Sequence, residues 1–178
     1  MGAVKIEHLP HYTYEDYKHF EGDWELVDGI AYAMAPAPIV THQAISANII
    51  FELKNIFAKC KKCLVVHESD WHLADDTILR PDVLMICKEV QEHIDKTPEI
   101  VFEVISPSTV RRDEGQKFEL YESEGVQYYA MVYPERRVVK LYHLREGRFI
   151  KVGDYDNDLV PLHLNDCESL FDFSKIWR

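Results

Sequence analysis

Two short apolar runs that each carry an acidic residue constrain the fold of this chain most strongly. The first, residues 83–86, reads Val-Leu-Met-Ile and directly follows Asp82; the second, residues 100–105, holds Glu103 among five apolar residues. Continuous apolar runs of this length predict strands buried on both faces of a covered sheet. Acidic side chains are rarely buried unless they are paired, and two neighbouring carboxylates resist ionising together unless a cation neutralises them. The pattern therefore predicts a covered sheet with a carboxylate pair suited to a hard divalent metal.

The length and composition of the chain predict one ordinary globular domain, residues 1–178. Of the 178 residues, 47% are hydrophobic and 29% are charged, which is typical of folded proteins. No apolar run approaches the roughly 20 residues of a membrane helix, and the first ten residues lack the layout of a signal peptide. We therefore expect a cytoplasmic protein without a membrane partner.

The net charge of −11 opposes avid, non-specific binding to nucleic acid. Affinity for nucleic acid comes largely from lysine and arginine side chains that neutralise phosphates. Basic residues do surround the acidic pair in the sequence, at Arg80, Arg111, Arg112 and Lys117, and a local field can oppose the global one. The charge thus leaves room for a selective substrate or for a basic protein partner.

The four cysteines predict reduced thiols in a chain of this size. Only Cys60 and Cys63 have the spacing of a metal-ligand or redox pair, and no second matched pair exists to complete a zinc site. The alternative for this pair is an ordinary helix end.

Local signals predict alternating helices and strands. Thr13 and Asp16 resemble a capping box that opens a helix over residues 14–20, and Asp28-Gly29 predicts a hairpin turn between two strands. The further predicted helices span residues 41–59 and 108–124, and the predicted strands span residues 24–27, 30–34, 64–67, 79–86, 100–105, 128–133, 138–143 and 149–152. This order predicts a mixed α/β fold with a central sheet between helices, preceded by an N-terminal helix and a β-hairpin.

The residues around the acidic pair also resemble a known family. The shared strings are Arg80-Pro81-Asp82-Val83, Glu103-Val104-Ile105-Ser106-Pro107-Ser108-Thr109, Arg111-Arg112-Asp113 and Gly115-Gln116-Lys117. With further matches between Tyr14 and Tyr142, the sequence resembles the Uma2 family of restriction-endonuclease-like proteins, in the PD-(D/E)XK nuclease superfamily. The resemblance implies a restriction endonuclease-like fold, with a mixed central sheet and flanking helices.

The same resemblance implies a metal-dependent DNA endonuclease. Asp82 and Glu103 would bind Mg²⁺, or Mn²⁺ in its place, together with the backbone carbonyl of Val104. The superfamily's strand lysine would stand two residues after Glu103, where this chain has Ile105. The resemblance therefore implies a migrated lysine, for which Lys117 is the candidate. The structural alternative is that Asp82 pairs with an arginine while Glu103 faces a solvated edge.

Lys117 shares a helix face with Val110 and Tyr121, at spacings of seven and four residues, so it is expected to point inward. An inward lysine needs a negative partner, which a substrate phosphate could supply. As a fixed cation it would orient the attacking water and stabilise the transition state. The alternative is a local ion pair with Asp113.

His42 and Glu25 are the remaining candidate site residues. His42 lies on the inward face of its predicted helix, near an N-terminus whose dipole disfavours the imidazolium, so a neutral ring is expected. It would orient water beside the metal or be a satisfied core histidine. Glu25 faces the other side of its strand from Trp24 and Leu26, either as a third carboxylate near the metal or as an exposed side chain.

Two functions of different classes follow from these residues. The first is a Mg²⁺-dependent endonuclease that acts on DNA as a homodimer, because cutting both strands of a duplex needs two sites. The second is a nuclease-like scaffold that does not cut and acts through a partner protein or a second copy of itself. The acidic net charge favours the second, and the complete set of polar residues favours the first.

Overall fold

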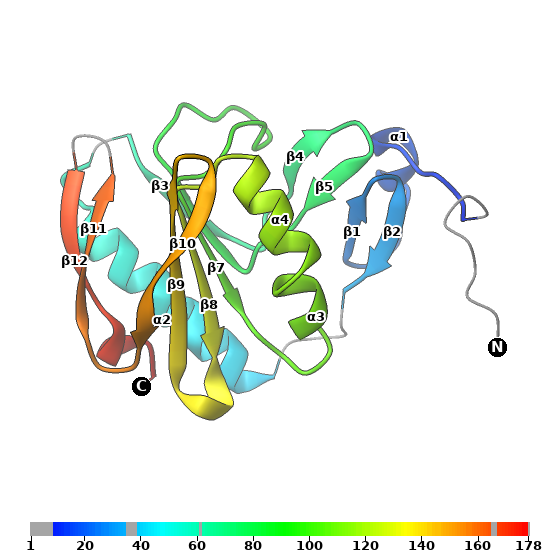
Figure 1. Ribbon diagram of the computed structural model, residues 1–178. Coiled ribbons are helices and arrows are strands. Elements are labelled where there is room, and N and C mark those ends of the chain that lie inside the picture. The colour runs from blue at the N-terminus through cyan, green and yellow to red at the C-terminus, as the bar shows by residue number, and fades with distance from the viewer. Residues whose placement is uncertain (1–8, 35–38, 61, 165–166, 178) are drawn as a thin grey trace. The chain divides into compact units, whose positions relative to one another are not determined.

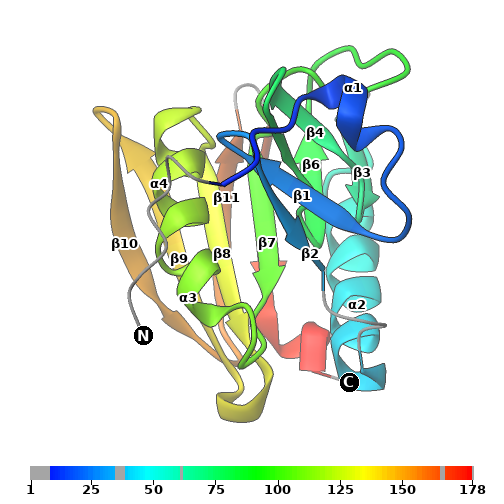
Figure 2. The ribbon, with the colours of Figure 1, turned by 90° about the vertical axis from the view of Figure 1, so that its right-hand side faces the viewer.

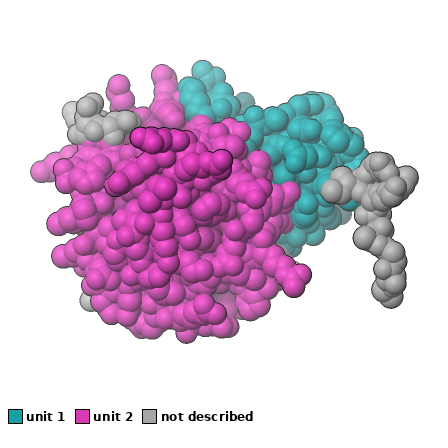
Figure 3. All heavy atoms as spheres, viewed as in Figure 1, with its two compact units in different colours: residues 1–37, 70–80, 90–96 teal, residues 38–69, 81–89, 97–178 magenta. Residues whose placement is uncertain are grey.

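The computed structural model describes residues 9–34, 39–60, 62–164 and 167–177. Its internal contacts divide the chain into two compact units (Figure 3). The first unit holds residues 1–37, 70–80 and 90–96, and the second holds residues 38–69, 81–89 and 97–178. This division does not test the expectation of one domain over residues 1–178, which stays a prediction.

The first unit is a short helix and a small antiparallel sheet. The elements are α1 (Tyr14–Tyr17), β1 (Trp24–Val27), β2 (Ile30–Ala33), β4 (Trp71–Ala74) and β5 (Thr77–Leu79), with strand order β2-β1-β5-β4. The predicted capping box is present, since the backbone N–H of Thr13 donates to the Asp16 carboxylate at 2.9 Å. The helix ends three residues earlier than predicted. β4 was not predicted, because its four residues carry only a weak apolar pattern.

The predicted hairpin of the first unit is confirmed. β1 pairs with β2 from Trp24 opposite Ala33 to Val27 opposite Ile30. The two turn residues, Asp28 and Gly29, have φ angles of 49° and 74°, the left-handed region that two-residue hairpin turns require. A Cβ atom on Gly29 would lie 2.3 Å from the ring of His11, so glycine is needed for space as well as for conformation.

The second unit is built on a six-stranded mixed sheet with the order β10-β9-β8-β7-β6-β3. Its strands are β3 (Leu64–His67), β6 (Val83–Ile86), β7 (Ile100–Val104), β8 (Tyr128–Tyr133), β9 (Val138–Arg145) and β10 (Arg148–Tyr155). Only β7 and β8 run parallel among these neighbours, as the helical connection between them allows. The predicted mixed α/β fold with a central mixed sheet is therefore confirmed.

Helices cover both faces of this sheet (Figures 1 and 2). α2 (Val40–Ile56) packs on one face through Ile45, Ile49 and Leu53, three residues of its predicted apolar stripe. α3 (Val110–Asp113) and α4 (Gln116–Ser123) connect β7 to β8 and cover the other face. None of the helices in the described part of the chain is long and apolar enough to cross a membrane.

A second hairpin completes the core on the α2 side. β11 (Leu159–Leu164) pairs with β12 (Cys167–Asp172), and the 3₁₀ helix η3 (Phe173–Trp177) follows. Phe171 and Phe173 are fully buried in the same apolar cluster as Phe102 of β7. Neither strand was predicted, although residues 159–164 alternate between exposed and buried positions as a half-buried strand should.

Two predicted elements are interrupted. The strand predicted over residues 79–86 is two strands in different sheets, β5 and β6, separated by Pro81, which has no backbone N–H to donate to a ladder. The helix predicted over residues 108–124 breaks at Gly115, where a Cβ atom would lie 2.8 Å from the carbonyl oxygen of Arg111. Asp82 follows the first break directly, and Lys117 stands two residues after the second.

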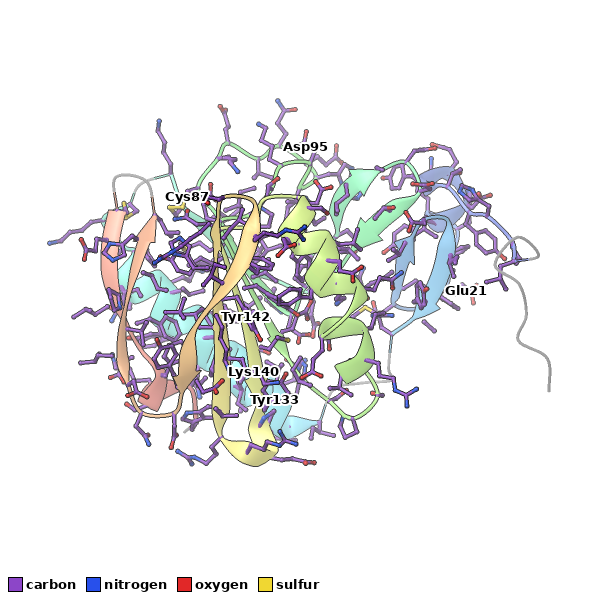
Figure 4. All side chains as sticks on the ribbon, viewed as in Figure 1. Glu21, Cys87, Asp95, Tyr133, Lys140 and Tyr142 are labelled. Atoms are coloured by element: carbon purple, nitrogen blue, oxygen red, sulfur yellow. A yellow bond between two sulfur atoms is a disulfide. The ribbon has the colours of Figure 1, made fainter. Side chains whose placement is uncertain are left out.

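The expectation of reduced cysteines is wrong. Cys60 forms a disulfide with Cys167, and Cys63 forms one with Cys87 (Figure 4). The first ties the segment after α2 to β12, and the second ties the segment before β3 to the end of β6. The prediction rested on the size of the chain, which does not reveal that the folded chain brings Cys60 to Cys167 and Cys63 to Cys87. Disulfides are typical of oxidising compartments, so the cytoplasmic location stays a prediction without support from these cysteines.

A surface network in the second unit predicts a small acid-dependent loss of stability. Glu114 accepts hydrogen bonds from the hydroxyl of Tyr133 and, at 2.9 Å, from Lys140, which lies on the neighbouring strand (Figure 4). These two bonds lower the pKa of Glu114 below its ordinary 4.5, whereas burial raises the pKa of Tyr133 to about 12. Because the folded pKa of Glu114 is depressed, its contribution is complete above pH 4.5 and is lost as the pH falls further.

We expect Glu114→Gln to remove about 0.2–1 kcal/mol of unfolding free energy at pH 7, since solvent screens this exposed pair. The difference from the wild type should shrink as the pH falls below 4.5 in urea melts. A difference that stays constant down to pH 3 would contradict the assignment.

Candidate active site

Strand pairing brings Asp82 and Glu103 together. β6 and β7 are antiparallel, with Val83 opposite Phe102, so the next position along this register sets Asp82 against Glu103. The backbone N–H of Asp82 donates to Oε2 of Glu103 at 3.4 Å, and the backbone N–H of Val104 donates to Oδ2 of Asp82 at 2.6 Å. The two carboxylates are thus fixed on neighbouring strands as the sequence predicted.

Both acids are withdrawn from solvent, although to different degrees. All five residues of β7 are buried and Glu103 is 3% exposed, so the alternative of a solvated edge is wrong. The side chain of Asp82 is 13% exposed. No described arginine pairs with Asp82, since Arg80 binds Asp70 at 2.7 Å and also Asp23. The arginine alternative for Asp82 is therefore wrong as well.

Helix α4 supplies two donors to Glu103. Lys117 donates from Nζ at 2.8 Å and Tyr121 donates from its hydroxyl at 2.7 Å, and both reach the same oxygen, Oε1. The two residues are four positions apart and therefore lie one above the other on one helix face. Lys117 points inward as predicted, and its nearest anion is Glu103.

Asp113, at the end of α3, is a third buried acid of this cluster. It is 2% exposed, and its Oδ1 lies 3.7 Å from Nζ of Lys117. The predicted local pair between these two residues therefore exists, but it is longer than the bond from Lys117 to Glu103. The hydroxyl of Tyr129 donates to the backbone carbonyl of Asp113 at 3.1 Å. Burial, followed by the charges of Glu103 and Asp113, raises the pKa of Tyr129 well above its ordinary value, which keeps the phenol protonated.

The charge of this cluster fits a divalent cation. Asp82, Glu103 and Asp113 bring three carboxylates together, and Lys117 pairs with two of them, with His42 as a titratable neighbour. In the described residues no group of three or more His, Cys, Asp or Glu side chains is arranged as a ready metal site. Mg²⁺, however, commonly binds through one or two carboxylates and keeps several waters. The two oxygen donors of Asp82 and Glu103 match that mode.

His42, in the first turn of α2, reaches the same cluster. Its Nε2 lies 3.2 Å from Oδ2 of Asp82, and its buried Nδ1 has no hydrogen-bond partner among the described residues. Burial lowers the pKa of His42, but the hydrogen bond and the charge of Asp82 outweigh burial and raise it above the ordinary 6.5. The helix dipole alone predicted a lower pKa and a neutral ring. The direction of that shift is wrong, because the carboxylate of Asp82, which local sequence does not reveal, raises the pKa.

The structure gives less direct support to the predicted roles of Val104 and Glu25 at a metal. The backbone N–H of Val104 binds Asp82, and the predicted role of its carbonyl as a metal ligand stays a prediction. Glu25, in the first unit, is fully buried, and its Oε1 accepts the backbone N–H of Arg80 at 2.9 Å. The alternative of an exposed side chain is therefore wrong for Glu25, while its role near a metal stays a prediction.

The sequence reasoning did not assign Tyr121 or Asp113 to the site. The spacing of four residues predicted that Tyr121 shares a helix face with Lys117. It did not predict which group accepts the hydrogen bond of the Tyr121 hydroxyl. Asp113 was predicted only as the local ion-pair partner of Lys117, four residues away. The signal that could have found both is burial, because a polar side chain on an inward helix face needs a partner there.

Comparison with solved structures confirms the fold. The crystal structure of "a putative nuclease belonging to DUF820" from Anabaena variabilis ATCC 29413 is similar to this chain with a TM-score of 0.74. The similarity covers 93% of this chain and 97% of the other, at 14% sequence identity. At that identity the likeness supports the fold alone. No curated protein matches the sequence.

Comparison with protein families gives a match over most of the chain. The model of the Uma2 family, described as "Putative restriction endonuclease", matches residues 12–167. That stretch contains the acidic pair, Lys117, Tyr121 and His42. Because the match spans most of the sequence, the chain belongs to the Uma2 family.

Proposed function

We propose that the protein is a metal-dependent endonuclease that hydrolyses phosphodiester bonds in DNA. The observation that carries the proposal is the fixed carboxylate pair at the ends of β6 and β7. Lys117 and Tyr121 both bind Oε1 of Glu103, which orients the other oxygen, Oε2, toward the backbone of Asp82. The description of the Uma2 family as restriction endonucleases agrees with the hydrolysis of phosphodiester bonds.

Asp82, Glu103 and the carbonyl of Val104 would hold Mg²⁺, or Mn²⁺ in its place. The bound ion would lower the pKa of a coordinated water and offset the negative charge of the scissile phosphate. The residues of the chain prepare this site before any ion binds. Val104 fixes one oxygen of Asp82 through its N–H, and no described residue donates to the other oxygen, Oδ1.

Lys117 and His42 would serve the reaction in different ways. The ammonium of Lys117, 3% exposed, lies 2.8 Å from Glu103 and would bring a positive charge to where the phosphate gains negative charge in the transition state. His42 is held by Asp82 through Nε2, which leaves the buried Nδ1 to bind and orient a water.

One observation favours a second function, a scaffold that binds a partner without cutting. The net charge is −11, and within the cluster Lys117 is already engaged by two carboxylates. A protein with this balance attracts a duplex weakly. For the endonuclease we propose a homodimer, because cutting both strands of a duplex needs two sites. The scaffold would act through a partner protein or a second copy of itself. Light scattering after gel filtration measures the oligomeric state directly.

Metal binding and DNA cleavage test the proposal together. We expect wild-type protein to cut plasmid DNA in Mg²⁺ or Mn²⁺ and to lose this activity in a chelator. Glu103→Gln should weaken Mn²⁺ binding, measured by calorimetry, at least about 10- to 100-fold, the loss that even an outer-shell partner of a metal causes.

The matched control is Glu52→Gln. Glu52 is also a buried glutamate, 1% exposed, whose Oε1 lies 2.9 Å from a lysine, Lys175. This variant removes the same kind of ion pair without touching the proposed site, so it should bind Mn²⁺ as the wild type does. If wild type and Glu103→Gln bind metal equally and neither cuts DNA in any condition, the endonuclease proposal is contradicted and the scaffold function is supported.

A further inference from the structure

The first unit contains a hollow of about 260 Å³ that the proposed chemistry does not use. Its lining comes from α1 and the turn after it, from β1 and β4, and from the segments around Arg80 and His93, all within the first unit (teal in Figure 3). Small-molecule sites commonly measure roughly 300–1,000 Å³, so this one suits a group of one or two rings.

Aromatic rings form most of the wall. Tyr14, Tyr17, Phe20, Trp24, His72 and His93 all line the hollow. The rings of Phe20 and Trp24 lie 5.5 Å apart, and those of His72 and His93 are stacked with centroids 5.0 Å apart. Tyr14 meets His72 edge to face at 4.7 Å. Flat, preorganised rings of this kind bind other flat rings by stacking, as single-strand nucleic-acid sites do.

Two cations share the hollow with these rings. Arg80 is held rigidly by its bond from Nε to Asp70 at 2.7 Å, by Asp23 on Nη1 and by Glu25 on its backbone N–H. Its second terminal nitrogen, Nη2, has no acceptor among the described residues. The ammonium of Lys18 binds Glu15 at 2.6 Å. A preorganised guanidinium with a free donor edge fits a phosphate oxygen.

Aromatic cages also bind organic cations through the faces of their rings. What favours a base that carries a phosphate here is the donor geometry, because the rings offer a stacking surface and Nη2 of Arg80 offers a donor to a phosphate oxygen. The carboxylates of Asp70, Asp23 and Glu15 are each already paired with Arg80 or Lys18.

We propose that this hollow binds one unpaired nucleotide of a nucleic-acid strand, with the base among the rings and the phosphate on Arg80 and Lys18. The inference rests on the proposed function and assigns it a substrate class, a strand with at least one base out of its duplex. Arg80 stands two residues before Asp82 in the sequence.

Fluorescence anisotropy in a chelator tests binding without cleavage. The probe is a labelled thymidine oligonucleotide of about ten nucleotides, within the site sizes of single-strand-binding folds. It is compared with an oligonucleotide of the same length that lacks its bases. Removing the bases should weaken binding about 5- to 150-fold, the range that base stacking contributes.

Two exposed lining residues have matched controls in the same unit. His93→Ala should weaken binding of the base-bearing strand only, whereas His19→Ala, outside the hollow, should not. Lys18→Ala should weaken both strands and reduce the slope of log affinity against log salt by about 0.7, the value for one phosphate contact on a single strand. Lys96→Ala is its control. Thermal melts confirm that all four variants fold.

The outcomes separate this inference from the proposed function. Equal binding of base-bearing and base-free strands, or unchanged binding by His93→Ala and Lys18→Ala, overturns the nucleotide site even if the protein cuts DNA. Binding as predicted without metal-dependent cleavage supports the site and contradicts the endonuclease. If thymidine monophosphate alone binds as tightly as the oligonucleotide, the site is one for a free nucleotide, and its assignment to a strand is overturned.

Discussion

Replacing Lys117 by methionine is expected to reduce DNA cleavage by about 10²–10³-fold, the effect of removing one preorganised electrostatic group from a transition state. Methionine keeps most of the side-chain volume but removes the ammonium that lies 2.8 Å from Glu103. Metal binding should not weaken, because Lys117 competes with a cation for the same carboxylate. The expected pattern is therefore a lower rate constant with Mn²⁺ affinity equal to or tighter than that of the wild type.

The same substitution is also expected to destabilise the fold. It leaves Glu103 and Asp113, which are 3% and 2% exposed, without their shared lysine. Breaking a buried ion pair by removing one partner costs about 3–5 kcal/mol of unfolding free energy. Divalent metal should restore part of this loss, because an ion that binds only the folded state stabilises it. Thermal melts with and without Mn²⁺ measure both effects.

Lys175→Met is the matched control for Lys117→Met. Lys175 also pairs with a buried glutamate, Glu52, at 2.9 Å, but its side chain is 43% exposed, so its loss should lower stability by less than the loss of Lys117. It should not change the cleavage rate below the melting temperature. If the two variants reduce cleavage equally, the effect of Lys117 is one of stability, and its assigned part in the chemistry is incorrect.

Loss of the Cys60–Cys167 disulfide is expected to lower the unfolding free energy by about 4–5 kcal/mol. The two cysteines are 107 residues apart, so the bond restricts a long loop of the unfolded chain. In the chain-entropy model the cost of closing a loop grows with its length. The double variant Cys60→Ala, Cys167→Ala isolates this bond in urea melts.

The Cys63–Cys87 disulfide gives the internal comparison. Its cysteines are only 24 residues apart, and the corresponding double alanine variant is expected to lose about 3–4 kcal/mol. The Cys60–Cys167 variant should lose more unfolding free energy than the Cys63–Cys87 variant, whatever the absolute size of the two losses. Labelling of the native protein with a thiol reagent should detect no free cysteine until the protein is reduced. Four reactive thiols in native protein would contradict both bonds.

The fold was predictable where apolar pattern and turn chemistry agreed. Asp28-Gly29 specified its hairpin because few other dipeptides accept two successive positive φ angles. The strand over residues 128–133 was predicted with the same bounds that the structure shows. All six of its residues are buried, so the continuous apolar run in the sequence matches a strand that is covered on both faces. β11 and β12 were missed because each gains its stability from packing on α2 and the sheet.

The site was predictable in part for a similar reason. An isolated acid in a dry strand is unusual enough to identify Asp82 and Glu103 from the sequence alone. The partners of those acids were not identifiable in this way. His42 is 40 residues from Asp82, and the bond between them raises a pKa that local reasoning had placed too low.

Local patterns in the sequence were enough to predict the Asp28-Gly29 hairpin, the strand over residues 128–133, the two isolated acids and the inward face that carries Lys117, because each of these depends on residues within a few positions of one another. Only the tertiary structure decided that Lys117 and Tyr121 share one oxygen of Glu103, that Asp113 is buried beside them, and which cysteines are bonded. The physical reason is that burial and charge act through space. A side chain's partner is fixed by the register of strands and the packing of helices, which no local spacing in the sequence contains.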